Sequence, residues 1–179
     1  MITWKQPTVP RHVCQMLVVD KHSLMMLIHR SENNISARNV WSMPSGTQEL
    51  GETTFDCISR ELMEELTLMP IQVQLLDQYE NIAGDSENPE QFHWVISLYM
   101  VLVKDISKFV NNEPNKHDQI LITNYNILED ELFLENFVFH TSLQLTLTRN
   151  RFHYHRNLMY FINPFIVDSS NVAKLTITP

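Results

Sequence analysis

Two short apolar segments separated by a polar turn open the patterned part of the chain. Val13 to Asp20 and Leu24 to His29 are rich in Val, Ile, Leu and Met, and Lys21-His22-Ser23 lies between them. Short apolar runs that are bounded by turn residues are typical of buried strands. We therefore predict a hairpin of two buried strands. A polar loop and the segment 40–46 follow, and in that segment Pro44 and Gly46 are predicted to end any regular element.

The segment from Thr53 to Leu68 has the period of an amphipathic helix that ends before Pro70. Its apolar stripe is predicted to consist of Phe55, Ile58, Leu62 and Leu66. The other faces of this helix carry the charged residues Arg60, Glu61, Glu64 and Glu65.

Three later segments are predicted to be strands, because apolar and β-branched residues recur between polar loops: Ile71 to Ile82, Phe92 to Val103, and Gln119 to Tyr125. The following region gives conflicting patterns. The segment 126–140 suggests a helix, whereas Leu143, Leu145 and Leu147 alternate with polar residues as in a strand. The tail 161–179 fits an edge strand, or an arm lying on the domain or on a partner subunit.

Length and composition indicate one globular domain. A chain of 179 residues with 44% hydrophobic residues is of ordinary single-domain size. We predict a core of about residues 10–140 and a C-terminal extension at 141–179. No apolar run is long enough for a membrane span, and no secretory signal is evident, so we expect a soluble, cytoplasmic protein. Cys14 and Cys57 lack metal-ligand spacing and are expected in the core.

The net charge of -8 argues against a surface that binds nucleic acid through phosphates. An acidic protein can still bind phosphates when its carboxylates hold divalent cations. Glu61, Glu64 and Glu65 stand at positions i, i+3 and i+4 of the predicted helix, where like charges repel unless a cation such as Mg²⁺ compensates them. The alternative is an ordinary solvated helix face braced by Arg60.

The spacing around this helix resembles a known family motif. Gly46, Glu52 and the run Arg60-Glu61-Leu62-Met63-Glu64-Glu65-Leu66-Thr67-Leu68 match the Nudix box, G-x5-E-x7-R-E-U-x-E-E-x-G-U, where U is apolar. The one departure is Thr67, where the family has a glycine at the helix end. Two of the 3 glycines, Gly46 and Gly51, fall in this motif, which suggests a need for backbone freedom or for the close approach of a ligand.

The resemblance implies an α/β fold, the Nudix α/β/α sandwich with a mixed β-sheet between helices. It implies Mg²⁺, with Mn²⁺ as a possible substitute, bound by Glu61, Glu64, Glu65 and the backbone carbonyl of Ser45 or Gly46. Glu52 and Arg60 would orient these ligands. The catalytic residues would be Glu61, Glu64, Arg60 and Glu113, and the general base would be either a helix glutamate or a carboxylate from a distant loop. Arg30 and Lys116 are predicted to bind the substrate.

The loop candidate is Glu113-Pro114-Asn115-Lys116, which is similar to the E-P-x-K element of MutT-like nucleoside triphosphate pyrophosphatases. The resemblance thus extends over about Val13 to Leu132. A plain polar turn is the alternative for this loop. The basic and aromatic residues between Arg149 and Arg156 suggest either nucleic-acid stacking or a surface or dimer contact. No histidine pair has H-E-x-x-H spacing, so no zinc site is predicted.

The expected activity is Mg²⁺-dependent hydrolysis of a nucleoside or deoxynucleoside triphosphate to the monophosphate and pyrophosphate. Alternatives within the same chemistry are a dinucleotide, a nucleotide sugar or a capped RNA end. An alternative of a different class is a Nudix module that binds a nucleotide or a protein without turnover, although such modules usually lose box carboxylates that this chain retains. A homodimer is plausible, and no membrane partner is expected.

Overall fold

A computed structural model describes residues 10–34, 37–83, 92–125, 127, 138–139 and 176–178. Its elements, in chain order, are β1 (Arg11–Asp20), β2 (Leu24–Arg30), β3 (Val40–Ser42), β4 (Ser45–Thr47), α1 (Thr54–Leu66), β5 (Pro70–Ala83), β6 (Phe92–Val103), the 3-10 helix η1 (Ile106–Lys108), β7 (His117–Asn124) and β8 (Thr176–Thr178). No helix in these ranges combines the length and hydrophobicity that a membrane span requires.

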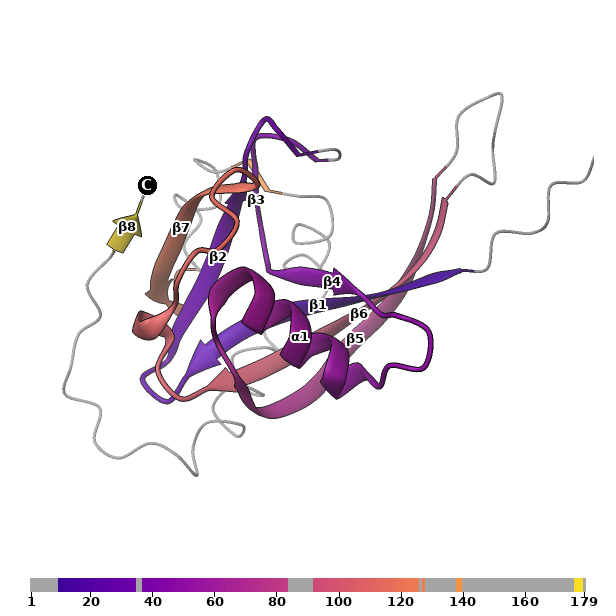
Figure 1. Ribbon diagram of the computed structural model, residues 1–179, viewed down its shortest axis with the longest axis horizontal. Coiled ribbons are helices and arrows are strands. Elements are labelled where there is room, and N and C mark those ends of the chain that lie inside the picture. Colours follow the sequence, from indigo (N-terminus) through magenta and orange to yellow (C-terminus); the bar gives the residue numbers. More distant parts are fainter. Residues whose placement is uncertain are drawn as a thin grey trace, which may run out of the picture.

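The strands form one mixed sheet in the order β5-β6-β1-β2-β7-β8, with α1 lying across one of its faces (Figure 1). β1 and β6 are parallel, and the other described pairs are antiparallel. The predicted strands are confirmed, and so is the hairpin, although β1 and β2 pair only beside their turn, at Val19 and Met25. Beyond that point each strand has another partner.

The segment 40–47 contains two short strands. β3 ends at Ser42, before Pro44, in agreement with the prediction that Pro44 ends a regular element, but Gly46 lies within β4 and does not end one. β3 pairs with β2 and β4 pairs with β1, in the space left where β1 and β2 separate. Pro44 lies between the two short strands, and its carbonyl accepts a hydrogen bond from the Met16 amide at 2.8 Å. Pro44 separates the two strands because it has no N–H to donate to a sheet hydrogen bond. On either side of it, the diverging strands β1 and β2 supply backbone hydrogen-bond partners for β4 and β3.

Both faces of the sheet are buried. Alternate residues of β1 face α1, among them Cys14, Met16 and Val18, and the residues between them pack into a second core on the other face. Trp41 and Phe139 belong to that second core, and the Trp41 amide donates to the Val138 carbonyl at 2.8 Å. The mixed sheet and its helix fit the predicted α/β class. A helix layer on the second face would fall at 126–140, which is mostly outside the described residues.

Near the C-terminus, β8 pairs with β7 at the edge of the sheet, as the edge-strand interpretation of the tail predicted for those residues. The alternation at 143–147 and the basic and aromatic residues at 149–156 lie outside the described residues. The division into a core and an extension at 141–179 stays a prediction.

Helix α1 forms where the sequence predicted it. Thr53 caps its first turn through a reciprocal pair of hydrogen bonds with Asp56. Ile58, Leu62 and Leu66 are buried as predicted, but Phe55 is 48% exposed and the smaller Cys57 is buried instead. Periodicity gives the direction of a side chain around a helix axis, but it does not tell how far along that axis the partner sheet extends. Both cysteines are buried thiols, as expected.

The C-terminus of α1 explains how threonine replaces the family's glycine. Thr67 adopts a left-handed conformation with φ 54°, and its amide bonds the carbonyls of Leu62 and Met63. This conformation costs a residue with a side chain about 1 kcal/mol. Asn112 offsets the cost, because its side-chain amide donates to Thr67 Oγ1 at 2.9 Å and to the Glu64 carbonyl at 3.0 Å. Its backbone amide donates to the Glu65 carbonyl at 2.9 Å.

We expect Asn112→Ala to lower the free energy of unfolding by about 1–2 kcal/mol, because carbonyl groups at the end of α1 lose a donor that water replaces only in part. Chemical denaturation of the parent and the variant measures the change. Asn33→Ala, at an exposed asparagine in the loop after β2, is the control and should have little effect. A change no larger than that of the control would show that Asn112 does not compensate for Thr67.

Candidate metal and catalytic site

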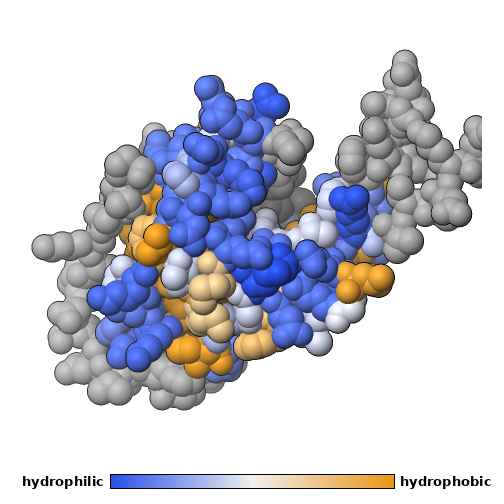
Figure 2. Space-filling view, in the orientation of Figure 1, coloured by the Kyte–Doolittle hydropathy of each residue, from blue (hydrophilic) through white to orange (hydrophobic). Residues whose placement is uncertain are grey.

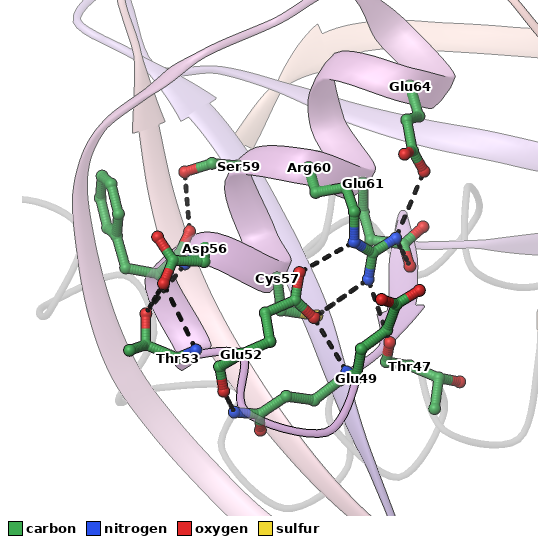
Figure 3. Close-up of polar contacts among 12 residues, drawn as sticks. Thr47, Glu49, Glu52, Thr53, Asp56, Cys57, Ser59, Arg60, Glu61 and Glu64 are labelled. Carbon is green, nitrogen blue, oxygen red and sulfur yellow. Dashed lines mark hydrogen bonds and ion pairs between the residues drawn. The ribbon is translucent and has the colours of Figure 1, made fainter.

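The Arg60 side chain forms hydrogen bonds with three acidic side chains (Figure 3). Its Nε and Nη2 atoms donate to the two carboxylate oxygens of Glu52 at 2.8 and 3.1 Å. Its Nη1 atom donates to Glu61 Oε1 at 2.8 Å and to Glu64 Oε2 at 3.3 Å. Nη2 also reaches the Thr47 carbonyl, so the guanidinium ties α1 to the end of β4. A planar group with several donors suits this forked arrangement.

Glu52 lies in the loop that precedes α1 and is held in place by its hydrogen bonds with Arg60. The paired guanidinium, helped by a hydrogen bond from the Glu49 amide, lowers the pKa of Glu52 to about 2. Glu52 therefore stays ionised and fixes Arg60 in one orientation. This position agrees with the orienting role that the resemblance assigned to Glu52 and Arg60, and the role itself stays a prediction.

Glu61 lies directly against the backbone of β4. A Cβ atom built on Gly46 would overlap Cγ, Cδ and Oε1 of Glu61. Gly46 is therefore required because the Glu61 side chain approaches it closely, whereas the glycine pattern suggested either the close approach of a ligand or a need for backbone freedom. Gly51 illustrates the need for backbone freedom, since its φ of 83° is a conformation that favours glycine.

Glu64 and Glu65 are neighbours in sequence but lie in different surroundings. The Glu64 side chain is 59% exposed and contacts only Arg60 among the described residues. Glu65 points inward, where ligand atoms of Glu65, Glu113 and His117 lie within 4.8 Å of one another. The polar contacts of the three box glutamates therefore differ. Glu61 and Glu64 share Arg60, whereas Glu65 meets residues from a distant part of the chain.

The loop before β7 brings Glu113 to Glu65. Asn112 binds the end of α1, and on the other side of the loop the Ser31 amide donates to the Lys116 carbonyl at 2.9 Å. Ser31 Oγ donates to the Asn115 carbonyl at 2.6 Å. Lys116 Nζ donates to Glu113 Oε1 at 2.8 Å. The segment 113–116 is thus a turn in its backbone, and its acidic side chain faces the box helix.

His117 reaches the same place because of an irregularity in the sheet. Along β2 and β7, Ile28 pairs with Ile120 and His29 with Gln119, but Arg30 pairs with His117, so Asp118 is an extra residue in β7. Such a bulge shifts the alternation of side chains by one position. Asp118 therefore meets His29 on the far face, with Nδ1 of His29 2.6 Å from Asp118 Oδ1, and His117 is turned toward α1.

Burial and like charge dominate the electrostatics of this group. Burial, followed by the charges of Glu61 and Glu113, raises the pKa of Glu65 to about 8, while Lys116 and Arg30 oppose the shift. Burial also raises the pKa of Glu61, although Arg60 counteracts it. Burial lowers the pKa of His117 to about 4, so its imidazole is neutral at pH 7. On β2, burial lowers the pKa of Arg30, and the nearby charge of Glu65 opposes this shift.

The donor atoms fit a divalent cation. Glu65 Oε2, Glu113 Oε2 and His117 Nδ1 are buried and have no hydrogen-bond partner among the described residues. Buried polar atoms without partners are rare and costly, and two of these atoms belong to acidic groups. A cation would satisfy all three and reverse the repulsion. The surrounding face, which carries α1, is largely hydrophilic in the view of Figure 2, as expected for a surface that admits charged ligands.

The structure thus places the predicted site residues in two adjoining groups. The first lies beside Gly46 and consists of Glu52, Arg60, Glu61 and Glu64. The second lies near Arg30 and consists of Glu65, Glu113 and Lys116. Sequence reasoning missed His117. Its position depends on the bulge at Asp118, and the predicted strand began only at Gln119.

Comparisons with known proteins agree with the fold and with the motif. The protein-family model of the NUDIX domain matches residues 9–138. The fold is similar to the crystal structure of a MutT NUDIX hydrolase from Burkholderia pseudomallei, with a TM-score of 0.63 at 20% identity, covering 79% of this chain and 98% of that one. It is also similar to a MutT protein from Bacillus halodurans, with a TM-score of 0.58 at 16% identity, covering 78% of this chain and 80% of that one. Since the family model spans most of the sequence, the chain belongs to the NUDIX family of pyrophosphate-bond hydrolases.

Proposed function

We propose that the protein hydrolyses a nucleoside or deoxynucleoside triphosphate to the monophosphate and pyrophosphate in a Mg²⁺-dependent reaction. The observation that carries this proposal is the meeting of box and loop carboxylates, with buried oxygens lacking partners, beside Arg30 and Lys116. Carboxylates that hold a cation, next to basic side chains, suit a substrate with a charged polyphosphate. The MutT proteins that share the fold support a nucleotide as the substrate.

Glu61, Glu64 and Glu65, with the backbone carbonyl of Gly46, would hold Mg²⁺, and Mn²⁺ would be a substitute. When bound, the ion neutralises charge on the phosphates and acidifies the attacking water. Gly46 suits this role because the lack of a side chain lets Glu61 lie against β4. Glu113, whose ligand atom lies within 4.8 Å of that of Glu65, would add a carboxylate from the loop before β7.

The remaining groups position the substrate and move the proton. Glu64 is the box carboxylate best placed to accept a proton from water, because it is exposed and has only one contact, at 3.3 Å, to Arg60. Arg60, fixed by Glu52, holds Glu61 in place. Lys116 extends to solvent beside Glu113 and, with Arg30, would bind the phosphates of the substrate.

We expect Glu64→Gln to lower kcat at least about 100-fold, as the loss of a general base usually does. Pyrophosphate and monophosphate release would be measured on a panel of nucleoside triphosphates, nucleotide sugars, dinucleotides and capped RNA in the presence of Mg²⁺. Glu80→Gln, at an exposed carboxylate of β5, is the matched control and should keep the parent rate. Equal rates for Glu64→Gln and the parent, or no turnover by either, would favour a module that binds without catalysis.

We expect Glu65→Gln to stabilise the protein in EDTA and to weaken its stabilisation by Mg²⁺. The pKa of Glu65 is raised to about 8 from its ordinary value of 4.5, so the folded protein loses stability as pH rises between these values. The amide removes that cost. Without metal, the melting temperature of Glu65→Gln should therefore exceed that of the parent by more at pH 8 than at pH 5. Each kcal/mol of unfolding free energy gained corresponds to a rise of about 2–4 °C.

The same melting experiment tests the metal site, since a ligand that binds only the folded state raises the melting temperature. Added Mg²⁺ should raise that of the parent more than that of Glu65→Gln. Glu80→Gln should respond to Mg²⁺ like the parent. An equal response of the parent and Glu65→Gln would remove Glu65 from the metal site.

We expect Gly46→Ala to abolish most activity, because the new methyl group would displace Glu61 from β4. Gly51→Ala is the matched comparison. Its added Cβ meets nothing within 4 Å, so its cost is confined to the strained φ of the backbone, about 1–2 kcal/mol of unfolding free energy. Turnover with Mg²⁺, measured below both melting temperatures, should fall at least about tenfold more in Gly46→Ala than in Gly51→Ala. Equal losses would contradict the steric explanation.

A further inference from the structure

His117 adds a nitrogen atom to a site that the box motif describes as carrying only oxygen ligands. Its side chain is almost fully buried, with 2% of its surface exposed. Its Nδ1 atom has no hydrogen-bond partner among the described residues, and neither does one oxygen of Glu65 or of Glu113. Ligand atoms of the same three residues lie within 4.8 Å of one another, so three residues that each have one buried polar atom without a partner converge on one small volume.

This convergence depends on features that regular secondary structure would not give. The extra residue Asp118 turns His117 to the α1 side of β7. Asn112 holds the loop against the end of α1, and Glu113 follows it directly. The Asn111 side chain donates to the His117 carbonyl at 2.7 Å, and the His117 amide donates to the Glu113 carbonyl at 2.9 Å. The backbone that carries Glu113 and His117 is therefore fixed at several points, independently of any ion.

The ligand chemistry of the three groups differs from that of a magnesium site. Mg²⁺ prefers oxygen ligands and usually retains several waters. An imidazole nitrogen favours transition-metal ions, whose affinity for nitrogen ligands rises along the series from Mn²⁺ toward Zn²⁺ and Cu²⁺. Two carboxylates and one imidazole form a ligand set of the kind that binds Zn²⁺ with a position left open.

We propose that Glu65, Glu113 and His117 form a site that binds a divalent transition-metal ion, such as Mn²⁺, Co²⁺ or Zn²⁺, in preference to Mg²⁺. This inference rests on the proposed function insofar as Glu65 belongs to both sites. It assigns Glu113 to metal binding and leaves proton transfer to the exposed Glu64. The search for H-E-x-x-H spacing could not find this site. That spacing places two histidines on one helix, whereas the residues of this site come from a helix, a loop and a strand.

Metal binding to the full-length protein without nucleotide tests the proposal. In calorimetric titrations of metal-free protein, Zn²⁺ should bind at least about tenfold more tightly than Mg²⁺. His117→Gln should weaken Zn²⁺ binding at least about tenfold, because even the loss of a group that only supports a metal ligand costs that much affinity. The same substitution should weaken Mg²⁺ binding less than about threefold. His22→Gln, the same change at an exposed turn residue, should leave both affinities as in the parent. Equal losses for the two ions in His117→Gln would overturn the proposal.

A second measurement does not depend on the folding of the variant. In nitrogen NMR of the unmodified protein with labelled histidine, saturating Zn²⁺ should strongly shift one ring nitrogen of His117, because its lone pair is donated to the metal. Unchanged ring signals of His117 would overturn the proposal even if Zn²⁺ bound elsewhere. Both experiments omit nucleotide, so they are separate from the Mg²⁺ hydrolysis panel. Loss of hydrolysis activity with intact Zn²⁺ binding would reject only the proposed function.

Discussion

Negative charge is concentrated where the end of α1 meets the loop before β7, and much of the nearby structure holds that charge in place. Glu65 faces Glu113 and lies within the field of Glu61, in surroundings that raise its pKa to about 8. Arg30 and Lys116 compensate only part of the repulsion. Without a cation the arrangement destabilises the fold. The contacts of Asn112 with the end of α1 hold the loop beside these carboxylates.

Arg60 has a different effect on the neighbouring carboxylates. Its guanidinium occupies both oxygens of Glu52, and it contacts one oxygen of Glu61 and one of Glu64. This cation is part of the chain and contacts Glu61 and Glu64 directly before any metal binds, whereas Arg30 and Lys116 act on Glu65 only as nearby charges. The motif therefore combines ligands of unequal character. In the proposed mechanism Glu65 would gain most from a bound ion, and the exposed Glu64 would accept the proton.

Much of the architecture follows from patterns that the sequence displays. The 3.6-residue period located α1, and runs of apolar residues located β1, β2, β5, β6 and most of β7. The box spacing selected the carboxylates of α1, whose roles stay a prediction, but it did not show that Glu65 separates from Glu64 and turns inward. A period describes one element at a time. Phe55 illustrates this limit, since its angular position fits the buried face and its side chain is nevertheless exposed.

The features that sequence patterns missed or left uncertain lie close to the site. Gly46 lies within a short strand although it was predicted to end a regular element, Thr67 takes a left-handed conformation that favours glycine, and Asp118 breaks the alternation of β7. A regular strand would have turned His117 to the opposite face, and a side chain at position 46 would have excluded Glu61. Functional sites are expected to depart from local rules in this way, because converging polar atoms need positions that regular elements reserve for apolar packing. The departures at Gly46, Thr67 and Asp118 therefore lie where the proposed function needs polar side chains to converge.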